Sequence, residues 1–418
     1  MEDHSQDSTA DLIVEGLNFP TSLAFDDDGT IYVAESGLNF GGPDTGGRIL
    51  RIDPHGPVCL KDGLRAPVNG LTFHSGELYI SEGGNPGRIS CLSADGSWRV
   101  ILDDLPGGGN YHTNEVAFGP DGWLYFGQGA MTNSGVIGPD ALNIAWLRKL
   151  PHPHDLPGLD LTLTGFNASC ELPEGTMNHT GAFAPFGTAT PTGQKLEATL
   201  PCTSAVMRCR PDGSDLELVA WGLRNPYGLG FLNDGRLLAL DLSINDRGSR
   251  PVGEVPDCLF EVEKGWWYGW PDYAAGVPVT HERYIPKRGA PPKPLIAYHD
   301  ALPPVRKPLI AFETHAAPVK FAIKTHDSDK GWLYVALFGD KIPMTGPDGP
   351  KAGRFVVRIN PENWRYETVK TPPLERPIDL DFHPQNGNLY VLDFGNYEMA
   401  GQSKLEAKTG SGKLYRIP

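Results

Sequence analysis

Hydrogen-bonding side chains recur at two fixed places in a repeated sequence pattern. The first place lies six residues before a repeated phenylalanine, and in four of the six repeats it holds a polar residue: His112, Asn225, His315 and Arg376. The second place lies six residues after a turn glycine. Five of the six residues there carry an acceptor oxygen: Glu35, Glu82, Gln128, Asp241 and Asp393. This regularity predicts that both sets of side chains meet at one site.

These residue types can do two kinds of chemistry. Imidazoles exchange protons near neutral pH, while Arg376 and Arg224, the neighbour of Asn225, can bind an anionic group. A ring of carboxylates can hold a cation, and without one the clustered negative charges raise each other's pKa. The simpler interpretation is a polar, water-filled channel in which the carboxylates only accept hydrogen bonds. Sequence alone leaves both interpretations open.

A second histidine-containing stretch, His152-Pro153-His154-Asp155, is a weaker metal motif. The proline holds the two imidazoles apart, and a His-x-His pair arises often by chance. The stretch is therefore either a minor metal site or part of an ordered loop.

Six sequence repeats must position these residues. Each repeat has an apolar-x-Phe segment or its equivalent, a turn and a second apolar strand, which is the pattern of a β-hairpin. The six hairpins pair residues 23–25 with 31–33, 71–73 with 78–80, 116–118 with 124–126, 229–231 with 237–239, 321–323 with 333–335, and 380–382 with 389–391. Third and fourth strands usually follow, for example 47–52 and 366–369.

Six repeats of four antiparallel strands predict an all-β, six-bladed β-propeller over residues 1–418 as a single domain. The early strand Leu12-Ile13-Val14 has no repeat before it, so we expect it to pair into the last blade and close the ring. An open β-solenoid or two β-sandwiches are the alternatives, but sandwiches do not explain six copies in one register.

Two long insertions interrupt the repeats, residues 130–203 in blade three and residues 272–318 between blades four and five. Their Pro, Gly and Asn content is typical of ordered loops. Because the start of a first strand and the end of a second strand meet at one edge of a blade, the polar positions should converge on one mouth of the central channel. We expect the first insertion to cover that mouth, above His112, as a lid.

Composition excludes several classes of partner. The formal net charge of -15 argues against binding nucleic acid or an anionic membrane surface, since both need a basic footprint. No apolar stretch of about 18 residues is present, and the start Met1-Glu2-Asp3-His4 lacks the pattern of a signal peptide. A small-molecule ligand and a monomer or dimer fit better. The six cysteines lack CxxC spacing, so we expect buried thiols, with one disulfide in the 170–209 region as an alternative.

The motifs in residues 222–229 (GLRNPYGL), 246–251 (DRGSRP) and 265–271 (GWWYGWP), with Arg376-Pro377-Ile378-Asp379, resemble the glucose/sorbosone dehydrogenase family. The resemblance covers most of the chain outside the long insertions. It implies a six-bladed propeller that oxidises an aldose or similar sugar with pyrroloquinoline quinone (PQQ) and calcium. It also implies a periplasmic or secreted location.

The resemblance also implies roles for single residues. His112 matches the family's general base, and Arg224 and Asn225 match residues that contact the quinone. With Arg376, His315 and Gln128, which the repeat register adds, they form the expected cofactor pocket. The expected calcium ligands are Glu35, Glu82, Asp241, Asp393 and Asp257.

Two other functions remain open. One is a calcium-dependent lactonase, in which the metal polarises a carbonyl and His112 or His315 activates water. The other is a non-catalytic binding propeller. No Gly-rich dinucleotide motif follows a strand, so a nicotinamide cofactor is not expected.

Overall fold

The computed structural model describes residues 10–37, 46–143, 146–172, 175–326, 329–340, 352–400 and 404–418. The start of the chain, on which the leader expectation rests, lies outside this part. The fold is all-β apart from two short α-helices, α1 (Pro139–Asn143) and α2 (Trp146–Lys149), and two 3-10 turns, η1 (Glu282–Tyr284) and η2 (His299–Ala301). Within these ranges, no helix combines the length and the apolar composition needed to cross a bilayer.

The described residues form six four-stranded antiparallel sheets. The first three, in strand order, are β2 (Pro20–Phe25), β3 (Ile31–Glu35), β4 (Gly47–Asp53) and β5 (Gly56–Leu64); β6 (Val68–His74), β7 (Glu77–Glu82), β8 (Gly87–Ser93) and β9 (Trp98–Leu105); and β10 (Thr113–Phe118), β11 (Leu124–Gln128), β16 (Ala205–Cys209) and β17 (Glu217–Trp221). The other three are β18 (Pro226–Phe231), β19 (Leu237–Asp241), β20 (Cys258–Val262) and β24 (Ile310–Ala311); β25 (Pro318–Ile323), β26 (Leu333–Leu337), β27 (Phe355–Asn360) and β28 (Arg365–Thr368); and β29 (Pro377–Phe382), β30 (Leu389–Asp393), β33 (Gly412–Ile417) and β1 (Asp11–Leu17).

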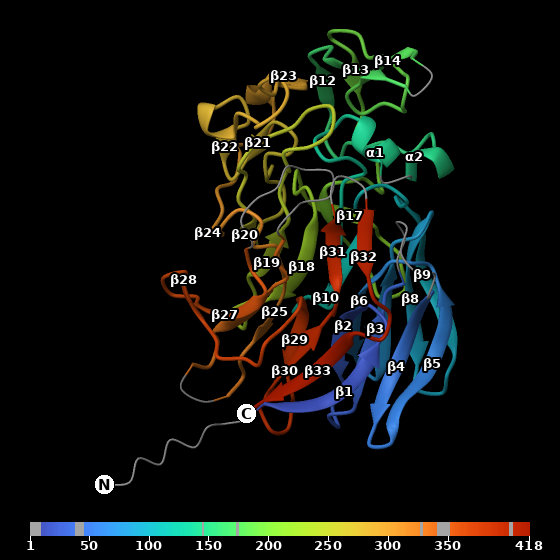
Figure 1. Cartoon of the computed structure of the whole chain (residues 1–418), viewed down its shortest axis with the longest axis vertical. Helices are drawn as coiled ribbons and strands as arrows, with labels where there is room; N and C mark the ends of the chain where they lie inside the picture. Colours follow the sequence, from blue (N-terminus) through green and yellow to red (C-terminus); the bar gives the residue numbers. More distant parts are fainter. Residues whose placement is uncertain are drawn as a thin grey trace.

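The first strands of the six sheets contact one another in the cyclic order β2, β6, β10, β18, β25, β29 and back to β2. Each hairpin predicted from the sequence is present as a pair of antiparallel strands. The predicted pairing of the amino-terminal strand is also present, since β1 lies beside β33 in the sheet that ends the chain (Figure 1).

Aromatic contacts between sheets explain the repeated phenylalanine. At four sheet-to-sheet contacts a tyrosine of one second strand meets the phenylalanine of the next first strand edge to face, with ring centroids 4.8 to 5.1 Å apart: Tyr79 with Phe118, Tyr125 with Phe231, Tyr334 with Phe382, and Tyr390 with Phe25. The last pair joins the carboxyl-terminal sheet to the first one. Edge-to-face pairs stabilise by about 0.5–1.5 kcal/mol beyond the area they bury.

The two insertions lie together at one end of the molecule (Figure 1). The first contains α1, α2, β12 (Leu161–Leu163), β13 (Asn167–Glu171), β14 (Met177–Gly181) and β15 (Lys195–Leu196). The second contains β21 (Tyr273–Ala274), β22 (Val277–Pro278) and β23 (Ile296–Ala297), and β12 pairs with both β15 and β23. The range 272–318 is not wholly an insertion, because it includes β24, the fourth strand of its sheet.

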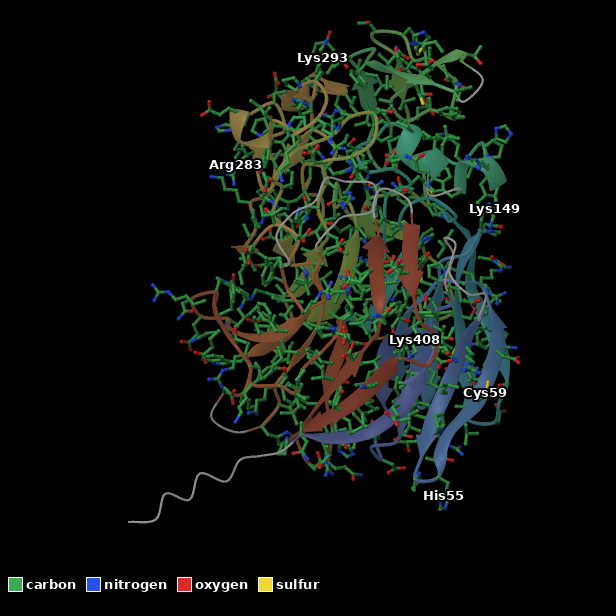
Figure 2. All side chains as sticks on the ribbon, viewed as in Figure 1. His55, Cys59, Lys149, Arg283, Lys293 and Lys408 are labelled. Atoms are coloured by element: carbon green, nitrogen blue, oxygen red, sulfur yellow. The ribbon has the colours of Figure 1, made fainter. Side chains whose placement is uncertain are left out.

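The disulfide alternative is wrong, because all six cysteines are free thiols. Five are buried, and Cys59 is exposed on the outer strand β5 (Figure 2). A short hairpin of β31 (Tyr397–Ala400) and β32 (Lys404–Ala407) completes the strands.

Candidate functional site

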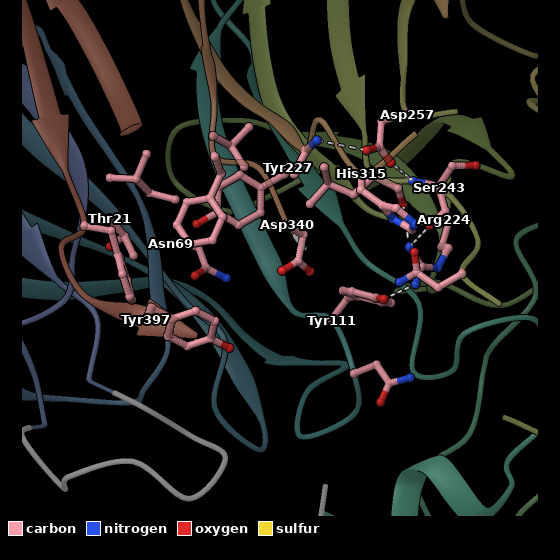
Figure 3. A pocket seen from close by; sticks show the side chains of 18 of the residues that line it. Thr21, Asn69, Tyr111, Arg224, Tyr227, Ser243, Asp257, His315, Asp340 and Tyr397 are labelled. Carbon is pink, nitrogen blue, oxygen red and sulfur yellow. Dashed lines mark hydrogen bonds between the residues drawn. The ribbon is translucent and has the colours of Figure 1, made fainter. Parts of the chain in front are cut away.

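A cavity of about 310 Å³ lies where the first strands begin and the second strands end (Figure 3). Its polar lining consists of Thr21, Ser36, Asn69, Asn110, Tyr111, Arg224, Tyr227, Ser243, Asn245, Arg247, Asp257, His315, Asp340 and Tyr397. Its apolar lining consists of Leu242, Ala317, Val319, Phe338, Ile378 and Phe394.

A bulge in every first strand decides which side chains line the cavity. In four sheets one residue of the first strand is left unpaired against the second strand: Thr21, Asn69, Tyr227 and Ile378. In the other two sheets the irregular stretch includes Asn114 and Val319. All of these except Asn114 line the cavity. A bulge re-aims the side chains of its strand, so in those four sheets the lining position falls two residues after the one that the sequence register predicted.

At the ends of the second strands, the residues that line the cavity come one residue after the predicted ones. The cavity is lined by the residues that follow the strand ends, Ser36, Leu242, Phe338 and Phe394, while Glu35, Glu82, Gln128, Asp241 and Asp393 are absent from its lining. Because consecutive side chains of an extended chain face opposite ways, a shift of one residue exchanges the two sets.

The predicted acids instead accept hydrogen bonds from backbone N–H groups of the segment that precedes the first strand of their own sheet. Glu35 accepts a hydrogen bond from the backbone N–H of Asn18 at 2.7 Å, and Glu82 accepts one from that of Arg65 at 2.6 Å. Asp241 accepts from Asn225 at 2.7 Å and from Arg224 at 3.3 Å. Asp393 accepts from Glu375, Arg376 and Gly395 at 2.8 to 3.0 Å.

Two of these acids also form ion pairs, Glu35 with Arg48 and Glu82 with Arg88 at 2.6 Å. Gln128 makes the corresponding link in its own sheet, accepting from the hydroxyl of Thr113 at 3.0 Å. Within the described ranges no group of three or more His, Cys, Asp and Glu side chains is placed to hold a metal ion. The structure therefore does not bring the expected calcium ligands together.

Asp257 is the one expected metal ligand that lines the cavity. Its carboxylate accepts the backbone N–H groups of Ser243 at 2.8 Å and Ala317 at 3.0 Å, which ties the fourth sheet to the start of the fifth. Burial raises its pKa to about 6. Both oxygens thus hold backbone groups in place.

Arg224 lines the cavity, but its hydrogen-bonding capacity is used within the protein. Guanidinium has five N–H groups. Nε donates to the carbonyl of Asn133 at 3.1 Å, Nη1 to the carbonyls of Leu242 and Ser243, and Nη2 to Oδ1 of Asn133 at 2.9 Å and to the hydroxyl of Tyr111. Arg224 therefore supplies positive charge to the wall and no spare donor.

Arg247 is the second guanidinium in the wall, and sequence reasoning did not select it. It is 5% exposed and forms an ion pair with Asp140 of α1 at 2.6 Å. Its Nη2 also donates to the hydroxyl of Tyr111 at 3.0 Å. Its buried Nε has no hydrogen-bond partner among the described residues. Each terminal nitrogen has one of these contacts, so Arg247 keeps N–H donors that the contacts of Arg224 use up.

The two expected histidines have different positions. His112 is 5% exposed, is absent from the cavity lining and packs against Gly83, where an added Cβ would lie 2.4 Å from the His112 Cβ. Burial lowers the pKa of His112 to about 4. His315 lines the cavity, and burial lowers its pKa, so its imidazole is neutral at pH 7.

Arg376 and Asn225 lie behind the cavity wall. The guanidinium of Arg376 is 4.9 Å from the ring centroid of Phe338 and 5.9 Å from that of Tyr397, and it donates to the carbonyls of Gly339 and Tyr397. It therefore supports an aromatic wall made of Phe338, Tyr397 and Phe394. The side chain of Asn225 accepts from Asn114 at 2.8 Å.

The His152–Asp155 stretch forms no metal cluster within the described ranges. Nδ1 of His154 contacts the carbonyl of His152 at 2.9 Å. Asp155 is buried and accepts hydrogen bonds from the N–H of Met131 at 2.7 Å and the hydroxyl of Thr203 at 3.1 Å. It thus joins the two ends of the first insertion, which is the loop interpretation.

Comparisons with known proteins agree with this architecture. No protein-family model matches the chain, and a search of curated proteins gives no match. Among solved structures, the chain is similar to the PQQ-bound form of aldose sugar dehydrogenase from Streptomyces coelicolor, with a TM-score of 0.57, 15% identity and coverage of 98% of each chain. It is also similar to the apo form of soluble aldose sugar dehydrogenase from Escherichia coli, with a TM-score of 0.55, 15% identity and coverage of 98% of this chain and 99% of the other.

The holo form of the PQQ domain of pyranose dehydrogenase from Coprinopsis cinerea gives a TM-score of 0.55 and 13% identity, covering 98% of this chain and 97% of that domain. At these identities the likeness concerns the fold. The chain described here thus shares its fold, from end to end, with structures named as sugar dehydrogenases.

Proposed function

We propose that this chain is a closed, single-domain, six-bladed β-propeller that oxidises a sugar or similar polyol with bound PQQ. Its two insertions act as a lid over the cavity. One observation carries the proposal: a single cavity is lined by Arg247, a cation whose N–H donors are not all used within the protein, and by His315, a neutral imidazole. The shared fold with PQQ-containing sugar dehydrogenases supports it.

The cavity suits PQQ in size, and its wall carries two guanidinium groups as well as the carboxyl groups of Asp257 and Asp340. PQQ is a flat, three-ring molecule with three carboxylates, and the cavity measures about 310 Å³. Arg247 would pair with one carboxylate, Arg224 would add positive charge from the wall, and the amides of Asn110 and Asn245 line the same region. When bound, the quinone supplies the hydride acceptor that no side chain can provide.

His315 is the proposed general base in place of His112. A general base must be unprotonated at the working pH and within reach of the hydroxyl proton. The depressed pKa of His315 keeps a ring nitrogen available for the anomeric hydroxyl proton, and its place in the lining gives it access. His112 meets the first condition, but it does not line the cavity.

The side chains of the described residues do not fit a calcium site in the expected form. The acids assigned to calcium hold backbone N–H groups, and no group of three ligating side chains is present in those ranges. We derive no step through calcium. For the same reason, a calcium-dependent lactonase has less support than the oxidoreductase.

The experiment that tests the proposal adds PQQ to purified protein and measures dye reduction with a panel of aldoses. PQQ-dependent reduction with at least one aldose supports the proposal, and reduction lost in His315→Ala assigns the base. A periplasmic or secreted location is part of the same proposal, and cell fractionation tests it.

A further inference from the structure

We propose that Asn133, at the start of the first insertion, is a positioning residue that holds the loop carrying Asn245 and Arg247 against the cavity. The inference rests on the proposed function in one respect, since it takes Arg247 as the arginine that meets the ligand. It assigns the insertion a part in building the site as well as in covering it.

The side-chain amide of Asn133 makes four hydrogen bonds, which is its full capacity. Nδ2 donates to the carbonyls of Asn245 at 2.8 Å and Arg247 at 3.0 Å. Oδ1 accepts from the backbone N–H of Asn245 at 2.9 Å and from Nη2 of Arg224 at 2.9 Å. The amide thus hydrogen-bonds to both the backbone N–H and the backbone carbonyl of Asn245, as a neighbouring β-strand would.

The backbone of Asn133 is tied down as well. Its carbonyl accepts Nε of Arg224 at 3.1 Å and Nε1 of Trp270 at 3.3 Å. Asn133 is 2% exposed, so water cannot replace these contacts without opening the structure. A satisfied, buried network of this kind fixes a single geometry.

The loop that Asn133 holds follows β19 and has no regular structure. Two of its side chains, Asn245 and Arg247, line the cavity. Arg247 has its own anchors in Asp140 and the Tyr111 hydroxyl, but its backbone is fastened through Asn133. Removing the amide should therefore release Arg247 while the six sheets remain intact.

Asn167 offers a matched control in the same insertion. Its Nδ2 donates to the carbonyls of Gly165 at 3.0 Å and Thr190 at 2.9 Å, and its Oδ1 accepts from the N–H of Thr190 at 2.9 Å. It clamps backbone with an amide, as Asn133 does, but neither of the residues it binds, Gly165 and Thr190, lines the cavity. A purely structural effect should appear in both variants.

The test compares wild type, Asn133→Ala and Asn167→Ala by two measurements. Phenylglyoxal labelling followed by peptide mass spectrometry reports how accessible Arg247 is without any ligand. Titration calorimetry with PQQ reports affinity. We expect Asn133→Ala to raise labelling of Arg247 severalfold and to weaken PQQ binding about tenfold, as loss of a supporting partner often does, with Asn167→Ala near wild type.

Equal labelling of Arg247 in both variants overturns the inference. If no variant binds PQQ, wild type included, the proposed function fails while the labelling still decides the role of Asn133. If Asn133→Ala does not fold, Asn133→Asp replaces it, because a carboxylate keeps the two acceptor contacts and loses both donors. Labelling of Arg247 in Asn133→Asp that matches wild type also overturns the inference.

Discussion

Tyr111 and His112 are consecutive residues that face different surroundings. The hydroxyl of Tyr111 accepts a hydrogen bond from Arg247 at 3.0 Å and lines the cavity, whereas the imidazole of His112 is buried against Gly83. β10 begins one residue later, at Thr113. Just before this strand, the side chain of Tyr111 therefore faces the cavity and that of His112 does not.

Substitution should therefore distinguish the roles of the two histidines, His315 in catalysis and His112 in stability. His315→Ala is expected to lower the rate of aldose oxidation by about 10²-fold or more, the usual contribution of a general base, with little change in unfolding free energy. His112→Ala is expected to lower stability by about 2–3 kcal/mol through the space it leaves, as measured by urea unfolding. Equal loss of turnover in stable His112→Ala protein speaks against this assignment.

The pKa of His112 predicts acid sensitivity. The folded protein holds this pKa at about 4, below the ordinary value of 6.5, so the unfolded chain binds more protons between these pH values. Stability should fall as pH drops through this window, by up to about 3 kcal/mol at its lower end. His112→Gln should flatten that part of the profile of unfolding free energy against pH. A profile unchanged in slope contradicts the prediction.

The two cavity arginines should respond differently to lysine. All five N–H groups of Arg224 are bound within the protein, so Arg224→Lys leaves several buried acceptors unsatisfied and should cost about 3 kcal/mol of stability. Arg247→Lys should mainly reduce PQQ affinity, because lysine does not reproduce the planar fork that binds a carboxylate. Calorimetry and urea unfolding on both variants check the contrast, and a reversed pattern contradicts it.

The acids that end four of the second strands are expected to act on stability. Asp393 accepts three backbone N–H groups, and Asp393→Asn places a donor among them, which should cost about 1–3 kcal/mol. Added calcium should leave the Tm of wild type unchanged, because these acids are not gathered around a cation. A calcium-dependent rise in Tm that Asp393→Asn abolishes argues for a metal role.

The sequence predicted the strands better than the site. Hairpin patterns such as 380–382 with 389–391 depend on local preferences and turn residues, and they appear in the structure as paired strands. The bulge at Ile378 leaves no comparable sequence signal, and it moves the cavity-facing position from Arg376 to Ile378. A residue count that assumes a regular strand therefore selected residues such as Arg376, which lie behind the cavity wall.

The fifth repeat shows a second limit. Ile323 pairs with Leu333 as Phe25 pairs with Ile31, so Ile323 and not Phe321 occupies the repeat position. His315 thus lies in the loop before β25 and reaches the cavity for a reason other than the predicted register. Arg247 was within the quoted 246–251 motif, but its exposure to the cavity depends on contacts with Asn133 and Asp140, which are far away in sequence.

The most direct test of the central claim is the rate of aldose-dependent dye reduction by PQQ-treated protein, compared in wild type, Arg247→Ala and His315→Ala. The account predicts PQQ-dependent reduction in wild type, activity in Arg247→Ala that returns only at higher PQQ concentration, and no comparable recovery in His315→Ala. Wild-type protein that shows no reduction with any aldose, or variants that match wild type at limiting PQQ, would contradict it.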